Sequence, residues 1–440
     1  MNRFRELYQS KLVSVEEALQ HIQSRNHIVT ALGASEPQGL LSQLHTISDR
    51  VEDVTVTTCL PMTSFDYFAK DQYRKHFTME GWFYMPVMRE NHPEQRVSYI
   101  PHHLRFAGLR RLVHRPVHVF LGSASPMDRY GYLSLSLSAT HERDMIEQAD
   151  LVIIEVNPKL PRTFGDTTVH VGEIDFIVEN EFDLPELPIP PLNEKDERIG
   201  KYIAEHIEDG STIQLGIGSI PNAVSKQLMN KKDLGIHTEM LTDGMVDLFE
   251  AGVITGKYKT LYPHKMVASF ALGTEKLYRF LDDNPGVAIL RNSYVNDPYV
   301  IAQNDKMVSI NTTLEIDLTG QCNSESIGHR QYSGTGGQAD TAIGAQMSRG
   351  GKSFIALHST TAVRVPGTNE RKTVSKIVPS LRKGAAVTLS RNDVDYVVTE
   401  YGVASLQGTS IRERVERLIS IAHPDFRDQL RKEAIKEQIW

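Results

Sequence analysis

The stretch DLPELPIPPLNEKDE, residues 183–197, decides how this chain of 440 residues is divided. Four prolines lie within seven residues of it: Pro185, Pro188, Pro190 and Pro191. Because proline lacks an amide donor and fixes φ, the stretch predicts an extended connector rather than a helix or a central strand. A chain of this length favours two to three domains, so we expect domains at 1–185 and 192–440. The alternative is a long loop inside one domain.

Strand and helix patterns alternate before the connector. Continuous apolar runs predict buried strands, and a helical pattern occupies residues 15–22 (VEEALQHI). Runs without polar interruption are typical of sheets that are covered on both faces. The predicted strands of this part are 54–60 (VTVTTCL), 117–122 (VHVFLG) and 151–156 (LVIIEV).

The same alternation continues after the connector. Helices are predicted at 196–207, where apolar residues share one face, and at 409–422, with Thr409 as the cap. The alternation favours an α/β fold with a mostly parallel sheet in each part, and two such domains facing each other would form a ligand-binding cleft. The predicted strands of this part are 211–218, 265–272, 287–291, 354–359 and 387–391.

Composition and charge exclude several classes of protein. The net charge of -7 argues against binding to duplex nucleic acid, which needs clustered Lys and Arg. Two cysteines, Cys59 and Cys322, cannot form a disulfide framework, so reduced thiols in a cytoplasmic protein are expected. The charged N-terminal segment has no apolar core of a signal peptide, and no run of about 18 apolar residues predicts a membrane helix.

Glu239 is the first candidate for chemistry. It lies in GIHTEMLTDG, residues 235–244, between apolar neighbours and just before a predicted turn and helix. An acidic residue in such a setting is either an ordinary residue at a helix start or a desolvated, reactive carboxylate. The local sequence alone favours the ordinary interpretation.

Two glycine-rich segments are candidates for binding a ligand. In QLGIGSIPNAVSKQL, residues 214–228, a strand runs into a glycine turn and a helix is predicted to begin near Pro221. The third glycine of a dinucleotide motif is absent, so a ligand-free turn is an equal alternative. In SGTGGQAD, residues 333–340, the glycines allow backbone amides to point at an anion, or form a loop without a role.

Other candidates are ambiguous or poorly supported. Asn296 in SYVNDP could form a turn or help to hold an oxyanion, and Glu400 follows a predicted buried strand. The pair His102-His103 has no metal-ligand spacing around it, so no metal is expected. Cys322 lacks the partners of a catalytic cysteine and Ser123 lacks the nucleophile elbow of a serine hydrolase.

Taken in order, these motifs resemble the acetyl-CoA hydrolase/transferase family, the class I CoA-transferases. The chain looks closest to the 4-hydroxybutyrate and butyrate CoA-transferases within it. The resemblance extends from ALGASEPQGLL at 31–41 to AHPDF at 422–426. Its main motifs are LGIGSIPNAV, HTEMLTDGMVDLFEAGVITG, VNDP, SGTGGQADTAIGA and DVDYVVTEYGVASLQG.

The resemblance implies two α/β domains and a set of site residues. Glu239 matches the family's nucleophilic glutamate, carried by the C-terminal domain, and Glu400 matches a glutamate near the active site. Asn296 and Gly337 match the residues that bind an oxyanion. The residues implied to contact coenzyme A (CoA) are Gly216, Ile217, Gly218, Ser219, Ile220, Asn311, Ser333, Gly334 and Gly337.

The resemblance also sets the expected activity and its alternatives. It implies transfer of CoA between a short-chain acyl-CoA and a free acid through a glutamyl-CoA thioester, with CoA as a substrate and no tightly bound cofactor. A homodimer or higher homo-oligomer is expected. Thr341 departs from the family, in which an aromatic residue often follows the aspartate matched by Asp340, and this affects the acyl pocket. The alternatives are an acyl-CoA hydrolase and a non-catalytic CoA- or nucleotide-binding protein.

Overall fold

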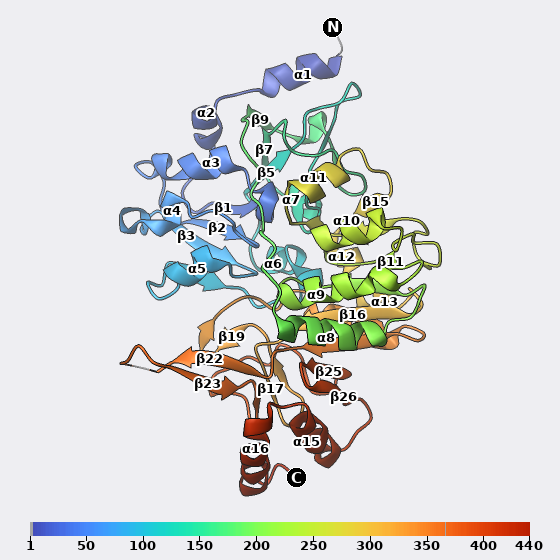
Figure 1. Cartoon of the computed structure of the whole chain (residues 1–440). Coiled ribbons are helices and arrows are strands. Elements are labelled where there is room, and N and C mark those ends of the chain that lie inside the picture. Colours follow the sequence, from blue (N-terminus) through green and yellow to red (C-terminus); the bar gives the residue numbers. More distant parts are fainter. Residues whose placement is uncertain (1–2, 366) are drawn as a thin grey trace. The chain divides into compact units, whose positions relative to one another are not determined.

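The computed structural model describes residues 3–365 and 367–440, which form two compact units (Figure 1). The first unit comprises 1–188, 239–243 and 265–295, and the second comprises 189–238, 244–264 and 296–440. The boundary between the two units, after residue 188, falls inside the proline-rich stretch. The chain forms neither helix nor strand between β9 (Phe176–Glu179) and α8 (Glu194–Glu205).

The units differ from the expected domains in one respect. Two segments from the C-terminal part of the chain, 239–243 and 265–295, group with the first unit, and Glu239 is among them. The reason is backbone pairing: β12 (Met240–Leu241) pairs with β14 (Phe270–Ala271), and the amide of Ala271 donates to Leu137 O at 2.8 Å. The second unit is therefore interrupted twice along the chain.

A seven-stranded sheet, parallel throughout, forms the centre of the first unit. Strands predicted at 54–60, 117–122 and 151–156 are confirmed as its members β2, β5 and β7. Nearly every residue of β1, β2, β5 and β7 is buried, as expected for strands covered on both faces. The order is β4 (Val97–Tyr99), β3 (Phe77–Gly81), β2 (Val54–Thr58), β1 (His27–Thr30), β5 (Val119–Ala124), β7 (Leu151–Val156) and β9.

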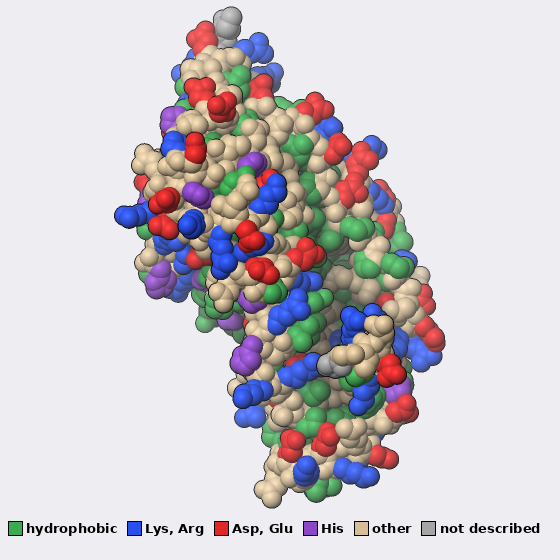
Figure 2. Space-filling view, turned by 90° about the vertical axis from the view of Figure 1, so that its left-hand side faces the viewer, with side chains coloured by type: hydrophobic (Ala, Val, Ile, Leu, Met, Phe, Trp, Pro, Cys, Tyr) green, Lys and Arg blue, Asp and Glu red, His purple; other side chains and the backbone are tan. Residues whose placement is uncertain are grey.

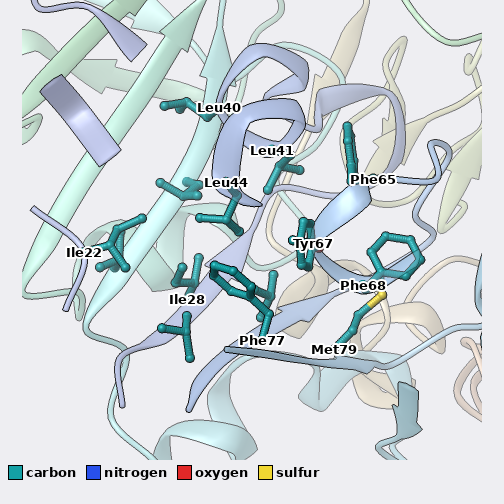
Figure 3. Close-up of a cluster of buried hydrophobic side chains, with 14 of the residues drawn as sticks. Ile22, Ile28, Leu40, Leu41, Leu44, Phe65, Tyr67, Phe68, Phe77 and Met79 are labelled. Carbon is teal, nitrogen blue, oxygen red and sulfur yellow. The ribbon is translucent and has the colours of Figure 1, made fainter. Parts of the chain in front are cut away.

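Apolar side chains between this sheet and short helices form the core of the unit. Ile28 of β1 and Phe77 of β3 belong to the same buried cluster as Leu40, Leu44 and Tyr67 (Figure 3). Each large side chain that is fully buried stabilises the fold by roughly 1.5–3 kcal/mol. The helices that contribute side chains to this cluster are α2 (Val15–Leu19), α3 (Gln38–Gln43) and α4 (Asp66–Ala69).

The strand predicted at 265–272 is divided. The structure has β13 (Met266–Ala268) and β14 in its place, with Ser269 between them. The amide and hydroxyl of Ser269 both donate to Glu239 O, at 3.0 and 2.9 Å, which removes Ser269 from either ladder. β13 pairs with β15 (Val287–Ile289), and β6 (Tyr132–Ser134) pairs with β8 (Thr168–His170).

The second unit is built on a six-stranded sheet. All its pairs are parallel except β25–β26, in agreement with the predicted mostly parallel sheet. Helices α8 and α9 (Ser219–Gln227) lie side by side (Figure 1), because Gly200 has no side chain to strike the backbone of Ala223. The order is β11 (Gly235–Ile236), β10 (Thr212–Leu215), β16 (Met307–Thr312), β21 (Lys352–Ala356), β25 (Tyr396–Thr399) and β26 (Gly402–Ser405).

Two local expectations for the second unit are wrong, and a third is confirmed. Residues 387–391 form no strand, because only Leu389 bridges to Cys322. Helix α15 (Ile411–Ser420) is capped by Ser410 rather than Thr409, since Ser410 and Glu413 form a reciprocal capping box. The helix expected to begin near Pro221 is confirmed as α9, which begins at Ser219 and contains Pro221 in its first turn.

The remaining elements are shorter or peripheral to the two sheets. The helices are α1 (Arg3–Lys11), α5 (Pro86–Asn91), α6 (Leu109–His114), α7 (Glu142–Ile146), α10 (Asp243–Glu250), α11 (Glu275–Leu281), α12 (Asn292–Val295), α13 (Pro298–Ile301), α14 (Gln338–Met347) and α16 (Pro424–Lys436). The strands are β17 (Glu315–Asp317), β18 (Cys322–Asn323), β19 (Ser326–Ile327), β20 (Arg330–Gln331), β22 (Thr360–Arg364), β23 (Arg371–Ser375) and β24 (Ile377–Val378).

Charged groups of both signs are mixed on the surface. Lys and Arg side chains alternate with Asp and Glu over the face in view in Figure 2. Among the described residues, no helix combines the length and apolarity that crossing a bilayer requires.

Buried glutamates fix the loops of the first unit. Glu155 accepts the amides of Gly39 and Leu40 at 3.0 and 2.8 Å, and Glu142 accepts the amide of Leu32 at 2.9 Å. Glu36, which is 1% exposed, accepts the amide of Met62 at 3.0 Å. Carboxylates that bond to backbone amides hold these loops without needing a cation.

Burial raises the pKa of Glu36 to about 8 from 4.5, and the hydrogen bonds from Met62, Thr58 and Thr63 oppose this only in part. Between those two pH values the folded protein holds a proton that the unfolded chain has released. The contribution to stability is therefore complete below pH 4.5 and is lost as the pH rises toward 8.

We predict that Glu36→Gln removes this pH dependence, because glutamine does not ionise. Relative to the variant, the wild type should lose on the order of 4 kcal/mol of unfolding free energy between pH 4.5 and 8. Denaturant unfolding followed by the fluorescence of Trp82, a buried residue of the first unit, measures it. Parallel stability curves for the two proteins would contradict the prediction.

Candidate active site

Three carboxyl groups of the first unit act electrostatically on the buried thiol of Cys59. Cys59 directly follows β2, and burial, reinforced by the charges of Glu239, Glu142 and Glu36, raises the pKa of its thiol well above the usual value. The thiol stays protonated and is not a nucleophile. Cys59 and Glu36 both follow strands of the parallel sheet, at the edge where such sheets commonly bind ligands, and the charge of Glu239 acts on the Cys59 thiol there.

The backbone at Glu239 is held rigidly. Its carbonyl oxygen accepts hydrogen bonds from the amides of Ser269 and Phe270, at 3.0 and 3.1 Å, and from the Ser269 hydroxyl. The flanking residues Thr238 and Met240 are buried, whereas Glu239 itself is half-buried. This arrangement fixes the point from which a partly desolvated carboxylate projects.

The predicted site residues are divided between the two units. Glu239 is the first residue of a segment that groups with the first unit, and Asn296 is the first residue of the segment that returns to the second. The structure brings Asn296, the turn at 216–220, the loop at 333–337 and Glu400 into the second unit.

The glycine turn follows β10 directly. The amide of Gly216 donates to Ile310 O at 3.0 Å, and Gly218 caps α9 with φ of +115°. Glycine is required at 218 by this backbone conformation alone, since a Cβ there would meet nothing within 4 Å. The Ser219 hydroxyl at the start of α9 donates to Asp196 Oδ1 at 2.8 Å.

Thr341, the residue that departs from the family pattern after Asp340, has a structural role that the sequence did not indicate. Its hydroxyl accepts a hydrogen bond from Asn311 Nδ2 at 3.0 Å and lies 3.2 Å from the Ser309 hydroxyl. Asn311 lies on β16 beside Gly216 of the glycine turn. Thr341 therefore orients one of the residues that the resemblance implies for CoA binding.

The second glycine loop is held at both ends. The amide of Ser333 donates to Glu325 O at 3.0 Å, and Gly337 is the N-cap of α14. Asn296 is fully buried, and the short helix α13 that begins two residues after it packs on α14 at Gly344. Amides at the start of α14 can stabilise negative charge.

Glu400 is buried directly after β25. Its carboxylate accepts the amide and the hydroxyl of Ser359, each at 2.8 Å, and lies 3.3 Å from Lys195 Nζ. Burial by itself would raise the pKa of Glu400, but the hydrogen bonds from Ser359 and its own amide, with the Lys195 charge, hold it below the usual value. Glu400 is a fixed negative charge.

Sequence reasoning missed three residues of these environments, Glu36, Glu142 and Lys195, and also Lys376, on whose amine the charge of Glu400 acts. Glu36 lies in ASEP, shortly after a buried strand, and its position there is a signal that could have been used. The two lysines give no such signal, because Lys195 lies on α8 and Lys376 directly precedes β24, each remote in sequence from Glu400 after β25. Charge clusters of this kind become visible only when the strands are assembled.

The remaining candidates have structural roles. Cys322 is buried, and the Ser123 hydroxyl is buried and donates to Ser35 O at 2.6 Å. Within the described part of the chain, no group of three or more His, Cys, Asp or Glu side chains could hold a metal ion.

Comparison with known proteins identifies the relatives. The family model for the acetyl-CoA hydrolase/transferase N-terminal domain matches residues 1–188, and the model for the C-terminal domain matches 273–434. The chain is 44% identical over 429 residues to a succinyl-CoA:cyclohexane-1-carboxylate CoA transferase of Geobacter metallireducens, covering 97% of this chain and 95% of that protein.

Two further relatives agree with this. A 4-hydroxybutyrate coenzyme A transferase of Clostridium kluyveri is 44% identical, covering 97% of this chain and 98% of that protein. The crystal structure of RipA from Yersinia pestis, 37% identical, superimposes with a TM-score of 0.92 over 99% of this chain and 100% of that one. By these matches along nearly its whole length, the chain belongs to the acetyl-CoA hydrolase/transferase family.

Proposed function

We propose that this protein is a CoA-transferase that moves CoA between a short-chain acyl-CoA and a free carboxylic acid, with Glu239 as the nucleophile. The observation that carries the proposal is the rigidly held, half-buried Glu239 in a chain whose relatives at 44% identity are named CoA transferases. Acetyl-, butyryl- and 4-hydroxybutyryl-CoA are the candidate donors.

The reaction proceeds by exchange at Glu239. The carboxylate attacks the thioester carbonyl, which gives a mixed anhydride and releases CoA as a thiolate. The thiolate then attacks the glutamyl carbonyl, forms a glutamyl-CoA thioester and expels the first acid as its carboxylate. A second acid reverses these steps, so the thioester bond is conserved and no nucleotide or metal is consumed.

The chain's other residues supply charge stabilisation and binding. Each attack develops negative charge on a carbonyl oxygen, which donors at Asn296 and at the amide of Gly337 would stabilise. The glycine turn at 216–220, Asn311 and the loop at 333–337 would hold CoA, and Glu400 would act as a fixed charge beside them. Binding energy from the long CoA chain keeps the reacting atoms together.

A hydrolase on the same scaffold is the second candidate. It differs only in that water, rather than an acid, takes the acyl group from the intermediate. The named acetyl-CoA hydrolases among the relatives are 28–29% identical over 54–68% of this chain, against 44% over 97% for the transferases. The transferase assignment is therefore the better supported.

Two properties follow from the proposal. CoA enters as a substrate, so the purified protein should hold no cofactor that turnover requires. We also propose that the protein is cytoplasmic and a homodimer, the commonest symmetric assembly.

We predict that mixing the protein with acetyl-CoA, without an acceptor acid, forms a CoA adduct on the peptide that carries Glu239. Intact-mass spectrometry under denaturing conditions, with borohydride reduction in parallel, detects the thioester. Glu239→Ala should give no adduct and lower exchange by at least about 1,000-fold, because the covalent route is removed.

The outcomes separate the candidates. Steady release of free CoA without acceptor or adduct would identify a hydrolase. Full exchange in Glu239→Ala would exclude Glu239 as the nucleophile. Absence of both adduct and CoA release with acetyl-, butyryl- and 4-hydroxybutyryl-CoA would exclude the transferase.

We further predict that Glu239→Asp is severely impaired. Removing one methylene displaces the carboxylate by about 1 Å from the thioester, a shift able to lower the rate on the order of 100-fold. Steady-state turnover measured with the same donor and acceptor tests this. Wild-type turnover would mean that the position of this carboxylate is not critical.

A further inference from the structure

Lys376 is a half-buried amine held in place by its backbone. It directly precedes β24, its amide donates to Ser359 O at 2.9 Å, and its carbonyl accepts the amide of Ile316 at 2.9 Å. Its amine reaches one acceptor, Thr313 O, at 3.3 Å. Within residues 3–365 and 367–440, no carboxylate lies within 4.0 Å of this amine.

The carboxylates that act on Lys376 from a longer distance are already bonded. Glu400 is held by Ser359 and Lys195, and Glu315 by Arg382 at 3.1 Å and by Asn323 Nδ2 at 3.1 Å. The cluster thus contains Lys195, Lys376 and Arg382 against Glu400 and Glu315. One positive charge is left without a partner.

Desolvation is evident at Lys376. Burial lowers the pKa of its amine to about 8 from 10.5, although the charges of Glu400 and Glu315 act in the opposite direction. A cation that is already partly stripped of water and fixed in place can accept an anion at a smaller desolvation cost than a flexible surface lysine.

Both lysines are connected to the glycine segments. Thr313, which Lys376 contacts, is bonded to the Ser324 hydroxyl at 3.1 Å, and Ser324 in turn donates to Gln338 at 2.7 Å, directly after Gly337. Lys195 is followed by Asp196, which accepts the Ser219 hydroxyl of the glycine turn. Lys376 and the residue after Lys195 are thus linked through hydrogen bonds to the two segments proposed to bind CoA.

We propose that Lys195 and Lys376 form an oxyanion subsite for a substrate, next to Glu400, whose carboxylate lies 3.3 Å from the Lys195 amine. The inference rests on the proposed function. An ammonium group is a point charge that binds a phosphate of CoA or the carboxylate of the acid equally well, and one unpartnered positive charge matches one such oxyanion.

The test compares Lys376→Met and Lys195→Met with the wild type. Calorimetric titration with CoA, dephospho-CoA and pantetheine gives three affinities, and steady-state exchange gives KM for acetate and butyrate. Loss of one charge-assisted contact should weaken the affected ligand by about 10- to 100-fold.

The pattern of losses identifies the oxyanion. Weaker CoA binding with unchanged pantetheine binding assigns a phosphate, and dephospho-CoA shows whether it is the 3′-phosphate. A raised KM for the acid with unchanged CoA binding assigns the carboxylate. Unchanged affinities and unchanged KM in both variants overturn the subsite.

Stability separates a binding role from a structural one. Replacing an amine that lacks a counter-ion by an apolar chain of similar length should leave the Tm of Lys376→Met unchanged or higher. A fall in Tm together with all affinities would mean that Lys376 supports the fold, and would overturn the proposal. Lys201→Met, on the exposed side of α8, is the control and should leave every value unchanged.

The readouts also separate this inference from the proposed function. Loss of affinity in Lys376→Met together with an absent Glu239 adduct would sustain the subsite and reject the transferase. A normal adduct with unchanged affinities and KM would sustain the transferase and reject the subsite.

Discussion

Parallel pairing of strands that are buried on both faces is the constraint on which this structure depends. Such strands cannot be joined by hairpins, so the chain crosses over through helices and returns to the same edge. The residues after each strand therefore gather at the carboxyl edge. In the first unit this edge carries Glu36 and Cys59, and in the second it carries the glycine turn at 216–220 and Glu400.

Buried carboxylates make these edges rigid. In the first unit, Glu36 and Glu142 accept backbone amides of loops, and Glu155 accepts the amides of Gly39 and Leu40 at the start of α3. In the second unit, Glu400 accepts both donors of Ser359. At Glu239 the backbone is held as well, because its carbonyl oxygen accepts both the amide and the hydroxyl of Ser269.

Long buried strands were predicted well, since a continuous apolar run such as LVIIEV at 151–156 is compatible with few structures other than a buried strand. Short elements were predicted less well. Residues 387–391 have strand propensity, but the neighbouring strand β18 is short and only Leu389 bridges to it, at Cys322. The run at 265–272 is divided because Ser269 bonds to Glu239 instead. The N-cap of α15 is Ser410 rather than Thr409, because the residue three positions after Ser410 is Glu413, which completes the capping box.

The sequence by itself determined the α/β class, the extended connector and the family, because these depend on local apolar runs, prolines and motifs in order. Only the tertiary structure decided that residues 239–243 and 265–295 group with the first unit, that Thr341 orients Asn311, and that Lys195 and Lys376 flank Glu400. These facts depend on pairing and charge between residues far apart in the chain, and no local pattern encodes which distant residue will be the neighbour.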